Sequence, residues 1–325
     1  MKRSVKSMTL VGSFLVAMGS NVFADEVTPS VSAEKKPEVT SQVKTGVYAE
    51  GETLPQNMIR ARVVGKSSVG SLKVYGKDGK TVDTNVDKYS AMGTALVVEY
   101  GVTNQLTGAV KVPFTMRNKV EANSQTVVDG KTGLGDVEAG ALYNVYNDGK
   151  FVFTTGLGMR FATGQYADVK NLDEATGEGR YSLGLRLNAD YQVVQGLWLS
   201  LQDQEEVTLA TVKHKASDTY YDKKGISRKA FAQVAYGFGA LSQDLKALSL
   251  KARYAYDYDN NVRNRTTGDK TPASSLHKVG GGAGVDLTGY NIPVSFDALY
   301  MTPVAGKSAY SAPNVEVSLN TYFQI

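Results

Sequence analysis

The feature that most constrains this chain is a two-residue alternation of apolar and polar residues, repeated in segment after segment. In "YSLGLRLNADY" (181–191) the odd-numbered residues are Tyr, Leu or Ala, and the even-numbered ones are Ser, Gly, Arg, Asn and Asp. Successive side chains of a β-strand point to opposite faces, so each such segment predicts a strand with one apolar and one polar face. The pattern therefore predicts an all-β protein.

We expect about twelve such strands, each near the ~9–11 residues that a tilted strand needs to cross a membrane. Water-soluble sheets usually have strands of about 5–6 residues. The predicted strand cores are 57–66, 89–101, 105–116, 135–147, 150–163, 179–193, 196–208, 227–240, 245–258, 276–288, 293–302 and 314–325. The connections between them alternate strictly between short and long, and the long ones are 67–88, 117–134, 164–178, 209–226, 259–275 and 303–313. This asymmetry is typical of outer-membrane barrels.

The beginning of the chain predicts export. Lys2, Arg3 and Lys6 precede the short apolar run "MTLVGSFLVAMGS", and "NVFA" follows with small residues at the cleavage positions. This is the pattern of a signal peptide, residues 1–24, cut after Ala24. Its removal leaves 33 basic and 32 acidic residues from the 36 and 32 of the full chain. A balanced charge without a basic block argues against a nucleic-acid partner.

An exported chain without a long apolar run can cross a membrane only as a closed barrel, because lipid offers the backbone no hydrogen bonds. We predict a single transmembrane antiparallel up-and-down β-barrel, residues 57–325, in the outer membrane of a Gram-negative bacterium. Outer-membrane lipid would surround it, and both ends of the barrel would lie on the periplasmic side. A water-soluble β-sandwich shows similar alternation, but strand length and loop asymmetry favour the membrane barrel.

Residues 25–56 differ from the rest, because they are rich in Pro, Glu, Lys, Ser and Thr and have no sustained period. They predict a flexible periplasmic tail, which is either a linker or a plug that folds into the pore.

The end of the chain, Val315 to Ile325, alternates to its last residue. It resembles the carboxy-terminal assembly signal of outer-membrane proteins, which implies the barrel-assembly machinery as a partner. The chain departs from that signal at Ile325, where Phe is common; Phe323 lies two residues earlier.

Three segments, "VVEYGVTNQLTGAVKVPF", "GLGDVEAGALYNVY" and "FTTGLGMRFATG", carry a further resemblance. In order and spacing they are similar to the MetA-pathway phenol-degradation-type transporters of the outer membrane. The matching positions are Thr103, Asn104, Pro113, Gly133 to Asp136, and Ala162 to Gly164, with Ala162 in place of the usual Pro. The resemblance covers roughly residues 50–200. It implies an outer-membrane barrel that takes up small, often hydrophobic or aromatic, molecules.

Alternation assigns charged side chains to the barrel interior, because an Arg or Lys facing lipid near the midplane costs ~2–4 kcal/mol. The predicted lumen-lining residues are Arg60, Arg62, Glu99, Lys111, Glu138, Arg160, Arg186, Asp190, Lys251, Arg253, Asp286, Asp297 and Glu316. They form either a polar pathway for solutes or a salt-bridged interior that only fills the barrel. Strand number does not decide between these, because barrels of about eight strands are filled and those of about sixteen are open.

One strand departs from the pattern. In "LWLSLQDQEEVTL" (197–209), Asp203 and Glu205 fall on the face of three leucines, and Trp198 points inward. A β-bulge or a strand that rises above the membrane would account for this.

The predicted function is passive uptake of a small solute that the sequence does not identify. The alternative is a non-conducting structural or surface-interaction protein that uses the external loops 209–226 and 259–275. An outer-membrane phospholipase would need a serine, a histidine and an orienting group, and the chain has only His214 and His277. We therefore predict no enzyme activity, no cofactor and no metal site.

Overall fold

The structure is a computed structural model. It describes residues 51–325, apart from 83–85, 123–124, 167–174, 213–218, 222–223, 261, 265–268 and 270. The predicted signal peptide, the predicted tail as far as residue 50, and His214 lie outside the described residues. No helix in the described part of the chain has the length and hydropathy of a membrane-spanning helix.

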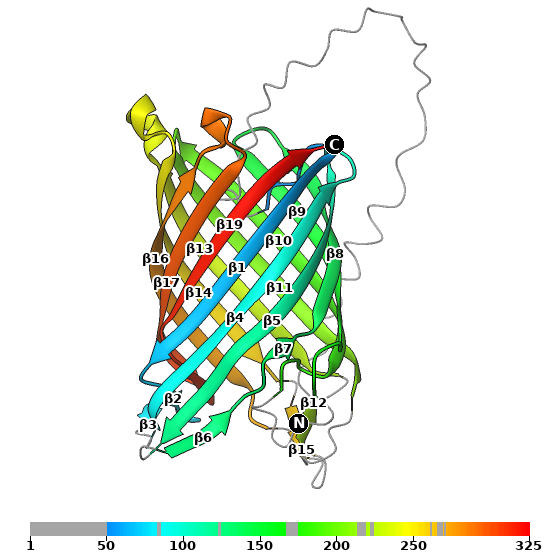
Figure 1. The fold of residues 1–325 in the computed structure, drawn as a ribbon, viewed down its shortest axis with the longest axis vertical. Helices are drawn as coiled ribbons and strands as arrows, with labels where there is room; N and C mark the ends of the chain where they lie inside the picture. Colours follow the sequence, from blue (N-terminus) through cyan, green and yellow to red (C-terminus); the bar gives the residue numbers. More distant parts are fainter. Residues whose placement is uncertain are drawn as a thin grey trace, which may run out of the picture. The chain divides into compact units, whose positions relative to one another are not determined.

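Twelve long strands form the closed antiparallel barrel seen in Figure 1. They are β1 (Met58–Gly70), β4 (Val86–Gly101), β5 (Leu106–Ala122), β8 (Val137–Asn147), β9 (Phe151–Phe161), β10 (Arg180–Val194), β11 (Leu197–Thr211), β13 (Ile226–Gly237), β14 (Leu248–Asp259), β16 (Ser274–Asp286), β17 (Val294–Lys307) and β19 (Asn314–Gln324). Each pairs with the next along the chain, and β19 pairs with β1 from Met58↔Gln324 to Ser68↔Asn314. The predicted up-and-down barrel is confirmed.

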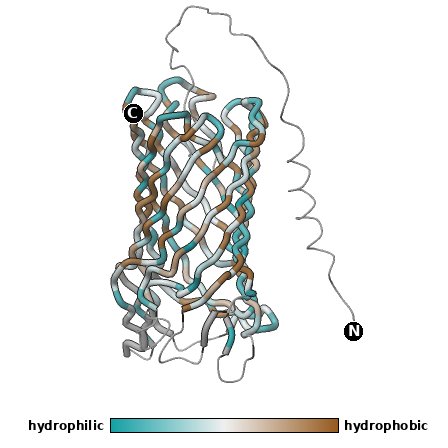
Figure 2. The backbone as a smooth tube through the Cα atoms, turned by 90° about the vertical axis from the view of Figure 1, so that its right-hand side faces the viewer, coloured by the Kyte–Doolittle hydropathy of each residue, from teal (hydrophilic) through white to brown (hydrophobic). Residues whose placement is uncertain are grey.

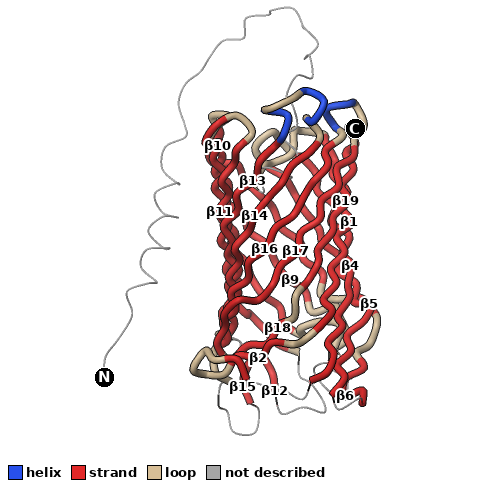
Figure 3. Tube along the Cα trace, turned by 90° about the vertical axis from the view of Figure 1, so that its left-hand side faces the viewer, coloured by secondary structure: helices blue, strands red, loops and turns tan. Residues whose placement is uncertain are grey.

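The short connections and the C-terminus lie at one end of the barrel, the periplasmic end (Figure 3). Three of these connections are tight turns, at 102–105, 148–150 and 195–196. The other two contain single turns of 3-10 helix: η2 (Phe238–Ala240), η3 (Gln243–Leu245) and η4 (Thr288–Tyr290). The alternation of short and long connections predicted from the sequence is therefore present.

The long connections at the external end carry strands of their own. These are β2 (Lys73–Tyr75), β3 (Thr81–Val82), β6 (Gln125–Asp129), β7 (Gly133–Leu134), β12 (Thr219–Tyr221), β15 (Val262–Asn264) and β18 (Ala309–Ser311). β18, β2 and β3 form one small sheet, and β12 and β15 form another. Several barrel strands also run further outward than predicted. β1 continues to Gly70 and β5 to Ala122, because backbone pairing persists where the side chains no longer alternate.

The barrel wall exposes its apolar face and buries its polar face, which is the reverse of a water-soluble protein. On β10, Leu183 and Leu187 are 44% and 37% exposed, whereas the inward Ser182 and Asn188 are buried. Along the tube of Figure 2, hydrophobic and hydrophilic residues alternate within the strands. A soluble sandwich would bury the leucines, so the exposed leucine face supports a wall in contact with lipid.

Asp203 and Glu205 of β11 lie on the outer face with no bulge beside them. Pairing between β11 and β13 is unbroken from Leu197↔Tyr236 to Val207↔Ile226, and the register of β11 with β10 shifts only near Leu197 and Leu209, so the predicted bulge is absent at these two residues. Arg228 of β13 donates from Nε and Nη2 to the two carboxylate oxygens of Asp203, at 2.7 and 2.6 Å. Charge pairing, rather than a change of register, therefore accommodates Asp203 outside the barrel. Trp198 is buried inside, as predicted.

Candidate functional site: the barrel interior

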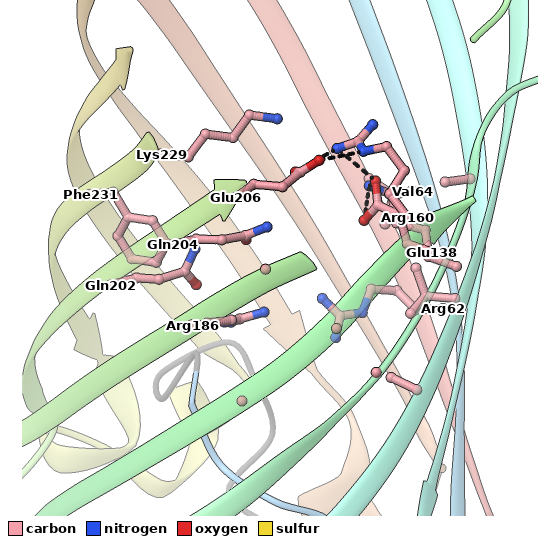
Figure 4. A pocket seen from close by; sticks show the side chains of 18 of the residues that line it. Arg62, Val64, Glu138, Arg160, Arg186, Gln202, Gln204, Glu206, Lys229 and Phe231 are labelled. Atoms are coloured by element: carbon pink, nitrogen blue, oxygen red, sulfur yellow. Dashed lines mark hydrogen bonds and ion pairs between the residues drawn. The ribbon is translucent and has the colours of Figure 1, made fainter. Parts of the chain in front are cut away.

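A cavity of about 690 Å³ lies inside the barrel (Figure 4). Charged side chains from all sides of the wall line it. Eight are cationic and five anionic, a net charge of +3: Arg62, Lys66, Lys111, Arg160, Arg186, Lys229, Arg253 and Lys278, with Glu99, Glu138, Glu206, Asp257 and Glu316. Charged groups are costly to bury without partners, so a cavity of this kind suits water and polar solutes.

Eight of the thirteen predicted lumen residues line this cavity: Arg62, Glu99, Lys111, Glu138, Arg160, Arg186, Arg253 and Glu316. Lys251 and Asp297 pair with each other in the interior. Asp286 lies at the end of β16, where its Oδ1 accepts a hydrogen bond from the N–H of Thr288. It is therefore placed at a turn, away from the cavity.

Sequence reasoning missed five charged residues that line the cavity: Lys66, Glu206, Lys229, Asp257 and Lys278. Strict counting of alternation would have found them. Once Trp198 is taken as inward, Glu206 follows eight residues later on the same face, and the outward Val234 places Lys229 inward.

An ion-pair network covers one side of the cavity toward the external end. Arg160 donates from Nε and Nη2 to the carboxylate of Glu206, at 2.9 and 3.1 Å. Arg160 also lies 3.3 Å from Glu138 and from Glu178, and Arg180 lies 2.5 Å from Glu178. Burial opposes ionisation of Glu178, but the two arginines hold its pKa below the usual value. The charges on this side are therefore largely neutralised.

A second, buried ion pair lies nearer the periplasmic end. Arg60 donates from Nε and Nη2 to Glu99, at 2.5 and 2.8 Å, and Arg62 Nη2 approaches the same carboxylate at 3.1 Å. The side chains of Arg60 and Glu99 are only 8% and 5% exposed. One carboxylate thus bridges two guanidinium groups, and the cluster keeps a net charge of +1.

Residues 51–56 run inside the periplasmic end of the barrel. Gly51 N–H donates to Asp190 Oδ2 of β10 at 3.1 Å, and Leu54 N–H donates to Thr107 Oγ1 of β5 at 2.8 Å. Leu54 is 2% exposed. At Asn57 the backbone adopts φ +63°, a left-handed conformation that Asn tolerates, and β1 begins at the next residue.

The barrel wall contributes a packed layer around this segment. Its inward side chains are nearly all buried: Val152, Thr154, Asn188, Trp198, Ser200, Gln233, Ala235 and Ser249. A Cβ at Gly51 would lie 2.5 Å from Cβ of Asn188 and 2.8 Å from Oγ1 of Thr154. Only glycine fits at this position, so the segment and the wall form one close-packed interior.

The glycine-rich motif "GLGD" has a structural role at the external end. Asp136 Oδ1 accepts from Gly164 N–H at 3.0 Å, and Oδ2 accepts from Glu178 N–H at 2.6 Å. Burial raises the pKa of Asp136, and the two backbone donors act in the opposite direction. The carboxylate fastens both described ends of the β9–β10 connection to the start of β8.

Replacing Asp136 with alanine is expected to loosen this connection without opening the barrel. Two hydrogen bonds to a buried carboxylate are lost, at a local cost of about 2 kcal/mol. Hydrogen exchange of the Gly164 and Glu178 amides should accelerate at least about tenfold. The matched control is Asp78→Ala, which removes an acceptor for Lys80 N–H in an exposed turn and should leave both amides unchanged.

His277 does not stand in a catalytic arrangement. It lies on β16, where its Nδ1 is 2.6 Å from the hydroxyl of Tyr254 and its ring is 5.0 Å from that of Tyr256. Among the described residues there is no group of three or more metal-ligating side chains.

The comparisons with known proteins agree with this architecture. A family described as "Putative MetA-pathway of phenol degradation" matches residues 67–221. An outer membrane channel from Pseudomonas putida F1 has the same fold, with a TM-score of 0.70, 15% identity, and coverage of 84% of this chain and 98% of that one. This chain is an outer-membrane β-barrel similar to the MetA-pathway family.

Other solved barrels are less similar to this chain. The translocator domain of the autotransporter NalP from Neisseria meningitidis gives a TM-score of 0.46, with 14% identity over 86% of this chain and 100% of its own. A KdgM porin gives 0.42, with 11% identity over 81% and 99%. Scores this low support no inference about function. None of the curated proteins compared with the chain gives a significant match.

Proposed function

We propose that this barrel is a passive outer-membrane pore for small solutes, and that residues 51–56 close its periplasmic end until they move. The observation that carries the proposal is the cavity of about 690 Å³, lined by thirteen charged side chains within a closed wall. A barrel built only as a filled support would gain more from apolar packing than from charges around a space. A pore needs that space.

The solute class follows from the lining. The family resemblance implies small, often hydrophobic or aromatic, molecules, and that expectation remains a prediction. Charged walls favour polar solutes, because a charge that faces an apolar solute loses its water without gaining a partner. We therefore expect polar solutes to pass through the lumen more readily than apolar ones of equal size.

The proposal also covers export of the chain and insertion of the barrel into the outer membrane. We propose export with cleavage after Ala24, and recognition of the last strand by the barrel-assembly machinery. On β19, Leu319 and Phe323 are exposed on the outer face, and Asn320 and Tyr322 are buried inside. The alternation of apolar outer residues and polar inner residues along β19 supports such recognition.

Liposome swelling tests the pore directly. Purified barrel in liposomes should give swelling rates that fall with solute size and that exceed those of protein-free liposomes. Planar-bilayer recordings should show discrete conductance steps. If the wild type and a variant lacking residues 51–56 are both sealed in both assays, the barrel is not a pore.

One observation favours the alternative, a surface-interaction protein. β12 pairs with β15 from Thr219↔Asn264 to Tyr221↔Val262, so the external connections 209–226 and 259–275 are joined by a sheet. A sealed barrel whose binding to a partner is lost when this sheet is removed would support that function.

A further inference from the structure

Three lysines from separated strands line the cavity and, among the described residues, form no ion pair with the Arg160 network. They are Lys66 on β1, Lys229 on β13 and Lys278 on β16. All three line the same cavity of about 690 Å³, so their like charges repel one another across it. Such an arrangement is unfavourable unless negative charge lies between the ammonium groups.

The protein supplies only part of that negative charge. Lys278 Nζ lies 2.6 Å from Asp257. Glu316 stands directly opposite Lys66 in the pairing of β1 with β19. Lys229 makes no hydrogen bond or ion pair within the described part of the chain, and its side chain is exposed to the lumen. The net charge of +3 around the cavity therefore resides mainly around these lysines, because the charges of the Arg160 network are paired.

Hydrogen-bond donors share one side of the cavity with Lys229. Figure 4 shows Gln202, Gln204 and Arg186 on the same side as Lys229, with Glu206 extending from that side across the space to Arg160. The ring of Phe231 lies beside them, with the Arg253 guanidinium 4.2 Å from its centroid. Ammonium, guanidinium and amide N–H groups are the donors that bind oxyanions in proteins.

We infer that this side of the cavity is a binding site for small oxyanions, bearing a carboxylate or phosphate group, and that it makes the pore anion-selective. The inference rests on the proposed pore function and adds the class of solute. An anion at Lys229 relieves the repulsion among the three lysines, whereas a cation increases it. Anions therefore enter the lumen at higher local concentration.

Reversal potentials in a potassium chloride gradient test the selectivity. The wild-type pore should be more permeable to chloride than to potassium. Lys229→Glu should lower that permeability ratio about fivefold, because it reverses one charge within the narrow lumen. Lys229→Arg keeps the charge and should keep the ratio. Lys150→Glu makes the same charge change in an exposed periplasmic turn and should leave the ratio unchanged. If Lys229→Glu does not fold, Lys66→Gln takes its place.

Added acetate or inorganic phosphate should each reduce the chloride current, and the stronger of the two identifies the preferred oxyanion. A conducting pore that is unselective or prefers potassium overturns this inference and leaves the pore function standing. Should no current appear even without residues 51–56, the pore function fails. In that case, anomalous diffraction from bromide-soaked crystals tests the anion site independently of conductance. A peak beside Lys229 supports the site, and the lack of one overturns it.

Discussion

Gly51→Leu is expected to raise the conductance of the pore at least about tenfold. The closed arrangement leaves no room for a side chain, since a Cβ would lie 2.5 Å from that of Asn188 and 3.0 Å from Asp190 Oδ2. A leucine must therefore displace residues 51–56 and break the hydrogen bond from Gly51 to Asp190. Only about 1.4 kcal/mol of differential stability changes an open-to-closed ratio tenfold. Single-channel recording measures the change.

The matched control for this experiment is Gly108→Leu. A Cβ at Gly108 meets nothing within 4 Å, so the same substitution is accommodated there without displacing any segment. Its conductance should equal that of the wild type. Deletion of residues 51–56 should reproduce the effect of Gly51→Leu. Low conductance in both Gly51→Leu and the deletion would show that the segment does not close the pore.

Glu99→Gln should be the most destabilising single substitution in the interior, at about 3–5 kcal/mol. The change leaves the guanidinium groups of Arg60 and Arg62 without their shared counter-charge, and Arg60 is too deeply buried for water to compensate. Urea unfolding of the barrel in lipid vesicles measures the loss. The single tryptophan, Trp198, is buried in the interior and reports unfolding by its fluorescence.

The control for Glu99→Gln is a more exposed pair. Lys111 and Glu138 are 42% and 28% exposed, and Glu138 keeps Arg160 as a partner when Lys111 is removed. Lys111→Met should therefore cost no more than about 1 kcal/mol. Equal losses for the two variants would mean that burial of Arg60 and Glu99 does not set the cost.

Alternation predicted the barrel because lipid outside and polar groups inside force every membrane-crossing residue to one face or the other. Leu183 and Arg186 could be placed on opposite faces from spacing alone. The same counting, applied to "ISRKAFAQVAYG", would also have placed Lys229 in the lumen. Alternation failed at Asp203, because it assumed that a charge on the outer face has no partner. The partner, Arg228, is remote in sequence and is brought opposite only by strand pairing.

The path of residues 51–56 could not be predicted. The segment "GETLPQ" has no period, and its composition suits a linker as well as a plug. What fixes it is a set of tertiary contacts, from Leu54 to Thr107 and from Gly51 to Asp190, that no local pattern encodes. The external strands β12 and β15 escaped prediction for a related reason, since each has three residues and depends on the other for its hydrogen bonds.

The seam between β1 and β19 has a consequence for biogenesis. Met58 faces Gln324, and the N–H of Ile325 donates to the carbonyl of Asn57, so the cylinder is sealed by residues from opposite extremes of the barrel sequence. Contacts this remote form slowly, because the intervening chain must first be organised. A barrel without β19 would be a sheet with two open edges, at β1 and β17, and such edges promote aggregation. The pairing of β19 with β1 and β17 therefore protects both edges at once.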